Sequence, residues 1–111
     1  MGDEIQNEIM FAYLALSDKW DAYAQASIQR FLAREALENA LAEALVEGRV
    51  QGKNEEERKA RARLVLREYY EALAQAEVEL IKAKAALEVA QARMEAVRLR
   101  AGLQGLKEEE R

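Results

Sequence analysis

The sequence predicts an all-α protein, a long antiparallel two-helix hairpin of the coiled-coil type that associates into a helical bundle. The chain of 111 residues contains no proline, the strongest helix breaker. Half of its residues are hydrophobic but only 6% are aromatic, because alanine and leucine supply most of the apolar share. Apolar residues also recur at helical spacing on both sides of a single turn.

That turn reads Gly-Arg-Val-Gln-Gly-Lys-Asn over residues 48–54. Gly48 follows the apolar pattern and can adopt the left-handed conformation that closes a helix, so we expect the first helix to end near Glu47. Asn54 is a favourable N-cap, and Glu57 three residues later completes a capping box. The second helix is therefore predicted to start at Glu55.

The first helix is predicted to span residues 4–47, with Asp3 and Gln6 as a further capping-box candidate. The apolar side chains that we expect on its inner face are Ile9, Tyr13, Leu16, Trp20, Tyr23, Ala24, Phe31, Leu41 and Leu45. Arg34 and Glu38 interrupt this face at a spacing that allows an ion pair. Alternatively, Ser17 and Asp18 cap a new helix and residues 3–16 form a separate one.

The second helix is predicted to span residues 55–101 and to carry a heptad pattern. One series is Leu66, Leu73, Leu80, Leu87 and Met94, and the complementary series is Ala62, Tyr69, Ala76, Ala83, Ala90 and Val97. If Glu47 faces Glu55, paired residue numbers sum to roughly 102, which sets Tyr13, Trp20 and Phe31 against the alanine-rich helix as a packed core. Gly102 and Gly105 are expected to end this helix, leaving residues 102–111 as a charged, frayed tail of one single domain, residues 1–111.

A second apolar series on the same helix also averages 3.5 residues per step. It comprises Val78, Ile81, Ala85, Val89, Ala92, Ala96 and Leu99. A helix that is apolar on two faces requires two neighbours, so these residues predict an oligomer, most simply a dimer. The alternative is a solvated face in which alanine serves only as a good helix former.

The charges are unevenly distributed along the chain. Residues 1–48 contain nine acids and three bases, whereas residues 49–111 contain twelve acids and fourteen bases. Opposite bias in the two arms favours their antiparallel pairing.

Composition argues against an enzyme. The chain has neither cysteine nor histidine, which removes thiolate and imidazole ligands, Ser-His and Cys-His catalysis and the Glu-x-x-His pairs of di-metal bundles. We therefore predict no catalytic residue, no metal and no cofactor. No apolar run has the length of a membrane span and the amino-terminal residues lack the basic region of a signal peptide, so a cytoplasmic protein without membrane contact is expected.

One dense basic cluster lies beside the turn and supports an alternative function, the binding of nucleic-acid phosphates. It comprises Lys53, Arg58, Lys59, Arg61, Arg63 and Arg67. Glutamates are interleaved with these residues, no aromatic platform accompanies them and the whole chain has a net charge of −4. We therefore favour a solvated, salt-bridged face over a nucleic-acid site.

Residues 45–58, with the Ala/Glu/Leu/Arg-rich helix that follows them, resemble uncharacterised small helical-hairpin proteins of bacteriophages and prophages. The resemblance implies a phage accessory protein that acts by binding. A designed helical hairpin is the competing origin. The function expected from the sequence is thus non-catalytic, through self-association and protein–protein binding.

Overall fold

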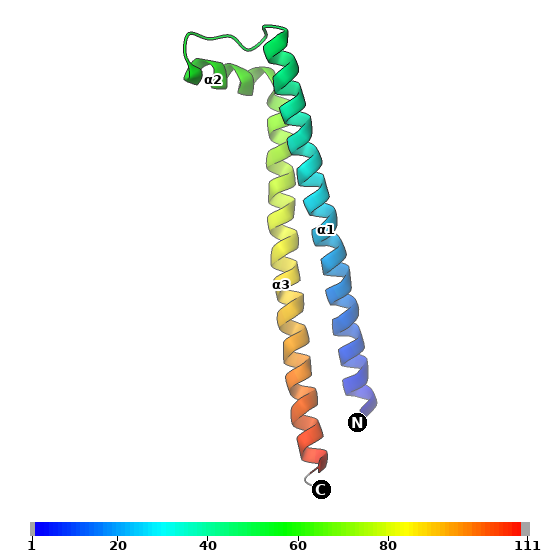
Figure 1. The fold of residues 1–111 in the computed structure, drawn as a ribbon. Coiled ribbons are helices and arrows are strands. Elements are labelled where there is room, and N and C mark those ends of the chain that lie inside the picture. The colour runs from blue at the N-terminus through cyan, green and yellow to red at the C-terminus, as the bar shows by residue number, and fades with distance from the viewer. Residues whose placement is uncertain (1, 110–111) are drawn as a thin grey trace. The chain divides into compact units, whose positions relative to one another are not determined.

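A computed structural model describes residues 2–109 and contains three helices (Figure 1). Helix α1 is Gly2–Val46, α2 is Glu55–Val65 and α3 is Arg67–Glu109, with 45, 11 and 43 residues. No strand occurs among the described residues. The predicted all-α class is confirmed.

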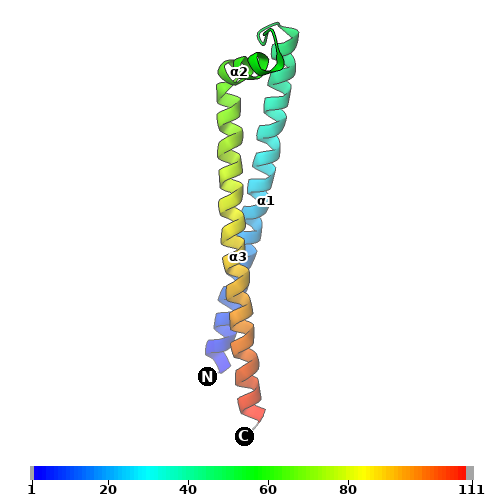
Figure 2. The same cartoon turned by 90° about the vertical axis from the view of Figure 1, so that its left-hand side faces the viewer.

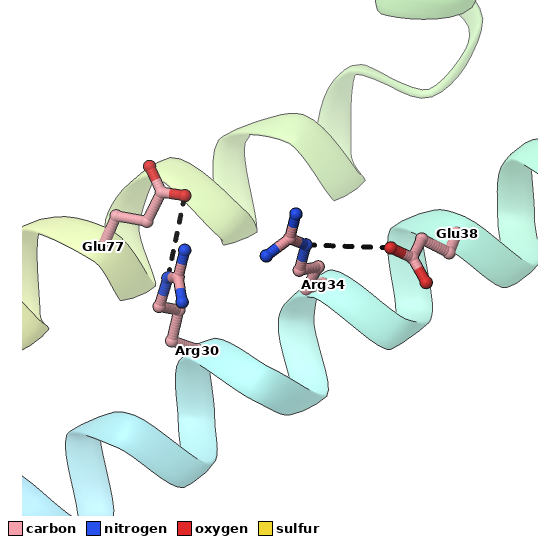
Figure 3. A network of polar contacts seen from close by, with 4 residues as sticks. All are labelled: Arg30, Arg34, Glu38 and Glu77. Carbon is pink, nitrogen blue, oxygen red and sulfur yellow. Dashed lines mark ion pairs between the residues drawn. The ribbon is translucent and has the colours of Figure 1, made fainter.

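The helices form two compact units. Unit 1 contains residues 2–24 of α1 and 82–109 of α3, and unit 2 contains residues 25–81. In unit 1, Ala12 of α1 packs with Met94 and Val97 of α3. In unit 2, Arg30 of α1 lies 3.9 Å from Glu77 of α3 (Figure 3). Each unit thus contains an antiparallel pair of helical segments.

The register of this pairing differs from the prediction. The ion pair between Arg30 and Glu77 joins residues whose numbers sum to 107, and the 2.6 Å contact between Glu8 and Arg100 gives 108. The expected sum was roughly 102, because Glu47 was set opposite Glu55 in a symmetrical turn. The difference arises because the first residues after the turn form α2, which does not continue the line of α3.

Helix α1 is continuous from Gly2 to Val46. Residues 3–16 therefore belong to the same helix as residues 17–46, and the alternative of a new helix capped by Ser17 and Asp18 is wrong. Asp3 lies in the first turn, so it is not the N-cap that the sequence suggested. Its carboxylate and that of Glu4 instead lie near the positive end of the helix dipole.

The end of α1 is closed as the glycine signal predicts. Gly48 has φ of 72°, and its N–H donates to the carbonyl of Leu45 at 3.2 Å. The N–H of Arg49 donates to the carbonyl of Ala44 at 2.9 Å. These two bonds define a Schellman motif, in which glycine adopts the left-handed conformation without a steric penalty.

The start of α2 is confirmed at Glu55, with Asn54 as its N-cap. Asn54 Oδ1 accepts a 2.9 Å hydrogen bond from the N–H of Glu57. The reciprocal bond departs from the usual capping box, because Glu57 Oε2 accepts from the N–H of Lys53 at 2.8 Å. The Glu57 carboxylate thereby also fixes the last residues of the loop.

The second arm is broken at Leu66, so the prediction of one helix over residues 55–101 is wrong. Leu66 has φ of −109° and ψ of 29°, and its carbonyl accepts from the N–H groups of both Tyr69 and Tyr70. Figures 1 and 2 show α2 turned away from the axis of α3 rather than extending it. In this position Ala62 and Leu66 pack with Ala44 in a buried cluster.

This cluster explains a break that has no proline or glycine to cause it. Its buried members are Ala40, Ala44, Val50, Ala62 and Leu66, with Leu41 and Tyr70 packed against them. Apolar burial stabilises by roughly 25 cal/mol per Å², so closing the end of unit 2 in this way outweighs the loss of helix continuity at one residue. The break is thus a consequence of tertiary packing.

Helix α3 continues to Glu109, through both glycines that were expected to end it. Neither Gly102 nor Gly105 has a positive φ, and a Cβ at either position would meet nothing within 4 Å. Glycine within a helix costs about 1 kcal/mol relative to alanine, but the neighbouring leucines are good helix formers. The predicted frayed tail is therefore wrong for residues 102–109, and residues 110–111 lie outside the described part of the chain.

The heptad seam of α3 is confirmed by burial. Leu66, Leu87, Met94, Ala62, Ala90 and Val97 are buried, and Leu73, Leu80, Ala76 and Ala83 are partly buried. Tyr69 is the exception, since it is exposed while Tyr70 packs against the buried cluster of unit 2. Because the helix is broken at Leu66, Tyr70 rather than Tyr69 occupies the inner position at the start of α3.

Candidate interaction surfaces

The second apolar series of α3 lies on the surface, where the sequence placed it. All seven residues are exposed: Val78, Ile81, Ala85, Val89, Ala92, Ala96 and Leu99. The exposed fraction reaches 69% at Ile81 and 70% at Leu99, although both are large apolar side chains. We call this surface the α3 stripe.

The α3 stripe continues beyond the residues that the sequence identified. Leu103 and Leu106 follow Leu99 at steps of four and three residues and are also exposed. With Gly102, Glu95 and Arg98 they line a groove of about 590 Å³. The sequence signal for this extension was the unbroken spacing, which the helix-ending interpretation of Gly102 and Gly105 obscured.

Helix α1 also carries exposed apolar side chains, and three of them were predicted to lie in the core. Tyr13, Trp20 and Phe31 are exposed, with Phe31 at 62%, so the prediction that they fill the alanine-rich side of the partner helix is wrong. We call this surface the α1 face. Its large side chains are Met10, Phe11, Tyr13, Leu14, Trp20, Ile28, Phe31 and Leu32.

The inner side of α1 is instead a heptad of its own. One series is Ile9, Leu16, Tyr23, Arg30, Leu37 and Ala44. The other is Ile5, Ala12, Ala26, Ala33 and Ala40, interrupted at the exposed Lys19. All the other members are buried or partly buried. The seven-residue steps are readable in the sequence. The predicted inner positions of Ile9, Leu16 and Tyr23 are confirmed. The alanine series was missed because the bulkier aromatic residues were given precedence, whereas alanine permits the close approach of two helices.

One ion pair and one aromatic contact lie within α1. Arg34 Nε lies 3.7 Å from Glu38 Oε1, which confirms the predicted ion pair within α1 (Figure 3). In unit 1, Trp20 and Tyr23 meet edge to face, with ring centroids 6.2 Å apart and an interplanar angle of 87°. This contact orients the Trp20 ring while leaving nearly half of that residue exposed.

The basic cluster beside the turn is exposed, and three of its members have partners within unit 2. Lys59 Nζ lies 3.4 Å from Glu55 Oε1, and Arg58 Nη1 donates to the carbonyl of Gly52 at 3.4 Å. The guanidinium of Arg63 lies 5.6 Å from the centroid of the Tyr70 ring. Such contacts use cations that would otherwise face phosphates.

Lys53 and Arg61 line a groove between the loop and α2 of about 920 Å³. Arg67 begins α3, on the other side of the break. The six cations that cluster in the sequence therefore belong to three different elements: the loop, α2 and α3.

Comparison with models of protein families, with curated proteins and with solved structures gives no match. None of the helices over residues 2–109 is long and apolar enough to cross a membrane. Within the same residues, no group of three or more carboxylates is arranged to hold a metal ion.

Proposed function

We propose that this protein is a non-catalytic helical hairpin that acts by self-association and by protein–protein binding. The observation that carries this function is the α3 stripe, which exposes Val78, Ile81, Val89 and Leu99 along a helix whose opposite side is a buried seam. The burial of apolar surface is the largest stabilising term available to a chain that has no cysteine, and a stripe left in water does not contribute to it. A partner surface that covers the stripe would bury its apolar side chains.

The exposed fractions of single side chains support this interpretation. Large apolar residues such as Ile81 and Leu99 are 69% and 70% exposed, and contiguous apolar surface of this kind is typical of interaction sites. The simplest assembly is a dimer, and the resemblance of residues 45–58 to phage and prophage hairpins extends the proposal to an accessory protein of that kind.

Self-association is tested by light scattering of the wild type and of a variant with Ile81→Glu and Val89→Glu. We expect an oligomer for the wild type and a monomer for the variant, because two charges on the stripe would have to be desolvated in the interface. The melting temperature should depend on protein concentration only in the wild type. A wild type that is a stable 12.6 kDa monomer at tens of micromolar would contradict the proposal.

A matched control carries Ala72→Glu and Gln91→Glu. Both positions are exposed on α3 but lie off the stripe, and the variant gains the same two charges. It should remain oligomeric. If it dissociates as the stripe variant does, added charge alone weakens the assembly and the stripe has no special role.

Nucleic-acid binding is the second candidate, favoured by the exposure of the basic side chains of α2. A gel shift in rising salt tests it, because phosphate contacts weaken steeply with salt. Salt-sensitive binding that is lost on substitution of Arg58, Arg61 and Arg63 by glutamate would favour this function. We expect no such shift, since Arg58 and Arg63 already have partners in unit 2.

A further inference from the structure

Unit 1 presents two exposed apolar surfaces that it cannot cover with one another. Its part of the α1 face includes Phe11 and Leu14, and its part of the α3 stripe includes Val89 and Leu99. Each helix uses its opposite side for the shared seam, where Ala12 meets Met94 and Val97. The two surfaces therefore point away from each other, and only a second molecule can cover them.

The side chains on the two surfaces differ in size. On the side of α1 away from the seam they are large: Met10, Phe11 and Leu14. On the α3 stripe within unit 1, the stripe residues from 85 to 96 are small, with alanines at 85, 92 and 96 beside Val89, and leucines follow at positions 99, 103 and 106. Large side chains packed against small ones fill space at native density, whereas two alanine-rich or two aromatic surfaces match less well.

The charges of the same segments also differ in sign. Residues 2–24 contain five acids and one base, whereas residues 82–109 contain six bases and four acids. Asp18 lies one turn from Leu14, and Arg93 lies one turn from Val89, so charged groups border both apolar surfaces. Pairing α1 with α1 would bring carboxylates together, and pairing α3 with α3 would join two segments of net positive charge, so the mixed pairing is electrostatically favoured.

One contact within the molecule already joins these two segments by charge. Arg100 Nη2 of α3 lies 2.6 Å from Glu8 Oε2 of α1, and both side chains remain substantially exposed. The same combination of an acidic α1 segment and a basic α3 segment is available between molecules.

We infer that, in the self-association proposed above, the α1 face of one molecule docks on the α3 stripe of a second molecule. Within unit 1 the stripe from Ala85 to Leu106 extends over roughly 32 Å of helix at 1.5 Å rise per residue, a length consistent with a specific interface. The contact joins two different surfaces, so after one contact the first molecule still has a free α3 stripe and the second a free α1 face, until the assembly closes.

Two variants, each damaged on one surface only, test this pairing. The first carries Phe11→Glu and Leu14→Glu on α1, and the second carries Val89→Glu and Leu99→Glu on α3. All four side chains are more than half exposed, so the substitutions leave the buried seam intact. Each variant alone should be monomeric in light scattering at concentrations where the wild type is an oligomer. A mixture of the two should form a 1:1 complex, because the intact α1 face of the second variant meets the intact α3 stripe of the first.

The alternatives give different results. If α3 stripes pair with each other, the α1 variant stays oligomeric and the mixture contains no complex that requires both variants. If α1 faces pair with each other, the α3 variant stays oligomeric instead. Either outcome overturns the inferred pairing but leaves self-association standing, whereas a monomeric wild type overturns self-association itself. Circular dichroism of each variant confirms that the helices are retained, and a variant that loses them is replaced by Leu14→Gln or Leu99→Gln.

Discussion

Unit 2 and unit 1 are built from the same two helices but stabilised by different means. Unit 2 ends in a Schellman motif, an N-cap and a loop residue, Val50, that is buried with Ala44 and Leu66. The buried cluster of unit 1 contains Ala12, Met94 and Val97 and receives no loop and no third helix. Local devices close one end of unit 2, whereas large apolar side chains stay exposed in both units, such as Phe31 and Ile81 in unit 2 and Phe11 and Leu99 in unit 1. The comparison teaches that closing the turn within the chain does not cover the outer surfaces of the two long helices.

The largest change in the free energy of unfolding is expected from a substitution in the buried cluster that closes unit 2. Leu66→Ala should reduce the free energy of unfolding by about 2–5 kcal/mol, because the side chain is 3% exposed and its removal leaves a cavity. Leu64→Ala, at 68% exposure on the neighbouring α2, should change it by less than about 0.5 kcal/mol. Chemical denaturation measures both, and equal losses would mean that α2 does not pack as described.

Replacing one glycine in each unit by alanine should change the free energy of unfolding in opposite directions. Gly48→Ala should destabilise by about 1–2 kcal/mol, since alanine is strained at a φ of 72°. Gly105→Ala should stabilise by up to about 1 kcal/mol, because the helix is regular there and a Cβ meets nothing within 4 Å. Thermal unfolding of both variants at one protein concentration provides the measurement. A loss at Gly105 would place the end of α3 before this residue.

The N-cap of α2 is expected to contribute less. Asn54→Ala should cost about 1 kcal/mol, through loss of the 2.9 Å hydrogen bond from the N–H of Glu57. Asn54→Ser, which preserves an accepting oxygen, should retain most of that stability. Urea denaturation checks the pair, and a cost below about 0.3 kcal/mol for alanine would contradict the assigned cap.

The ion pair of unit 1 should matter least. Arg100→Gln removes the contact with Glu8, and an exposed pair of this kind contributes about 0–1 kcal/mol. The difference from wild type should vanish in high salt, where surface charges are screened. Arg98→Gln, in which the arginine borders the groove of the α3 stripe, is the matched control. A large, salt-independent loss at Arg100 would indicate a packing role for its aliphatic stem.

Sequence reasoning was most successful where a structural effect has a local cause. Gly48, Asn54 and Glu57 define the two helix ends because each interaction spans only a few residues. The seam of α3 followed from its heptads, and the exposure of the α3 stripe from a second pattern on the same helix. These features depend on periodicity and on backbone hydrogen bonds, which are encoded in neighbouring residues.

It failed where distant packing decides between local options. The break at Leu66 has no helix-breaking residue and results from the cluster with Ala44 and Val50. The face of α1 was misassigned because two apolar patterns overlap there, and only the partner helix selects the alanine-rich one. Gly105 shows the converse, since a residue typical of helix ends remains helical when no left-handed turn follows it.

The cluster of unit 2 also has a consequence for the order of folding. Ala44 and Ala62 are 18 positions apart, whereas Glu8 and Arg100 are separated by 92. Closing the longer loop directly costs about 1.4 kcal/mol more in chain entropy, since the cost grows with the logarithm of loop length. We therefore expect the contacts around Val50 to form in the transition state and those of unit 1 to form afterwards. Stopped-flow kinetics should then show that Leu66→Ala slows folding, whereas Val97→Ala mainly accelerates unfolding.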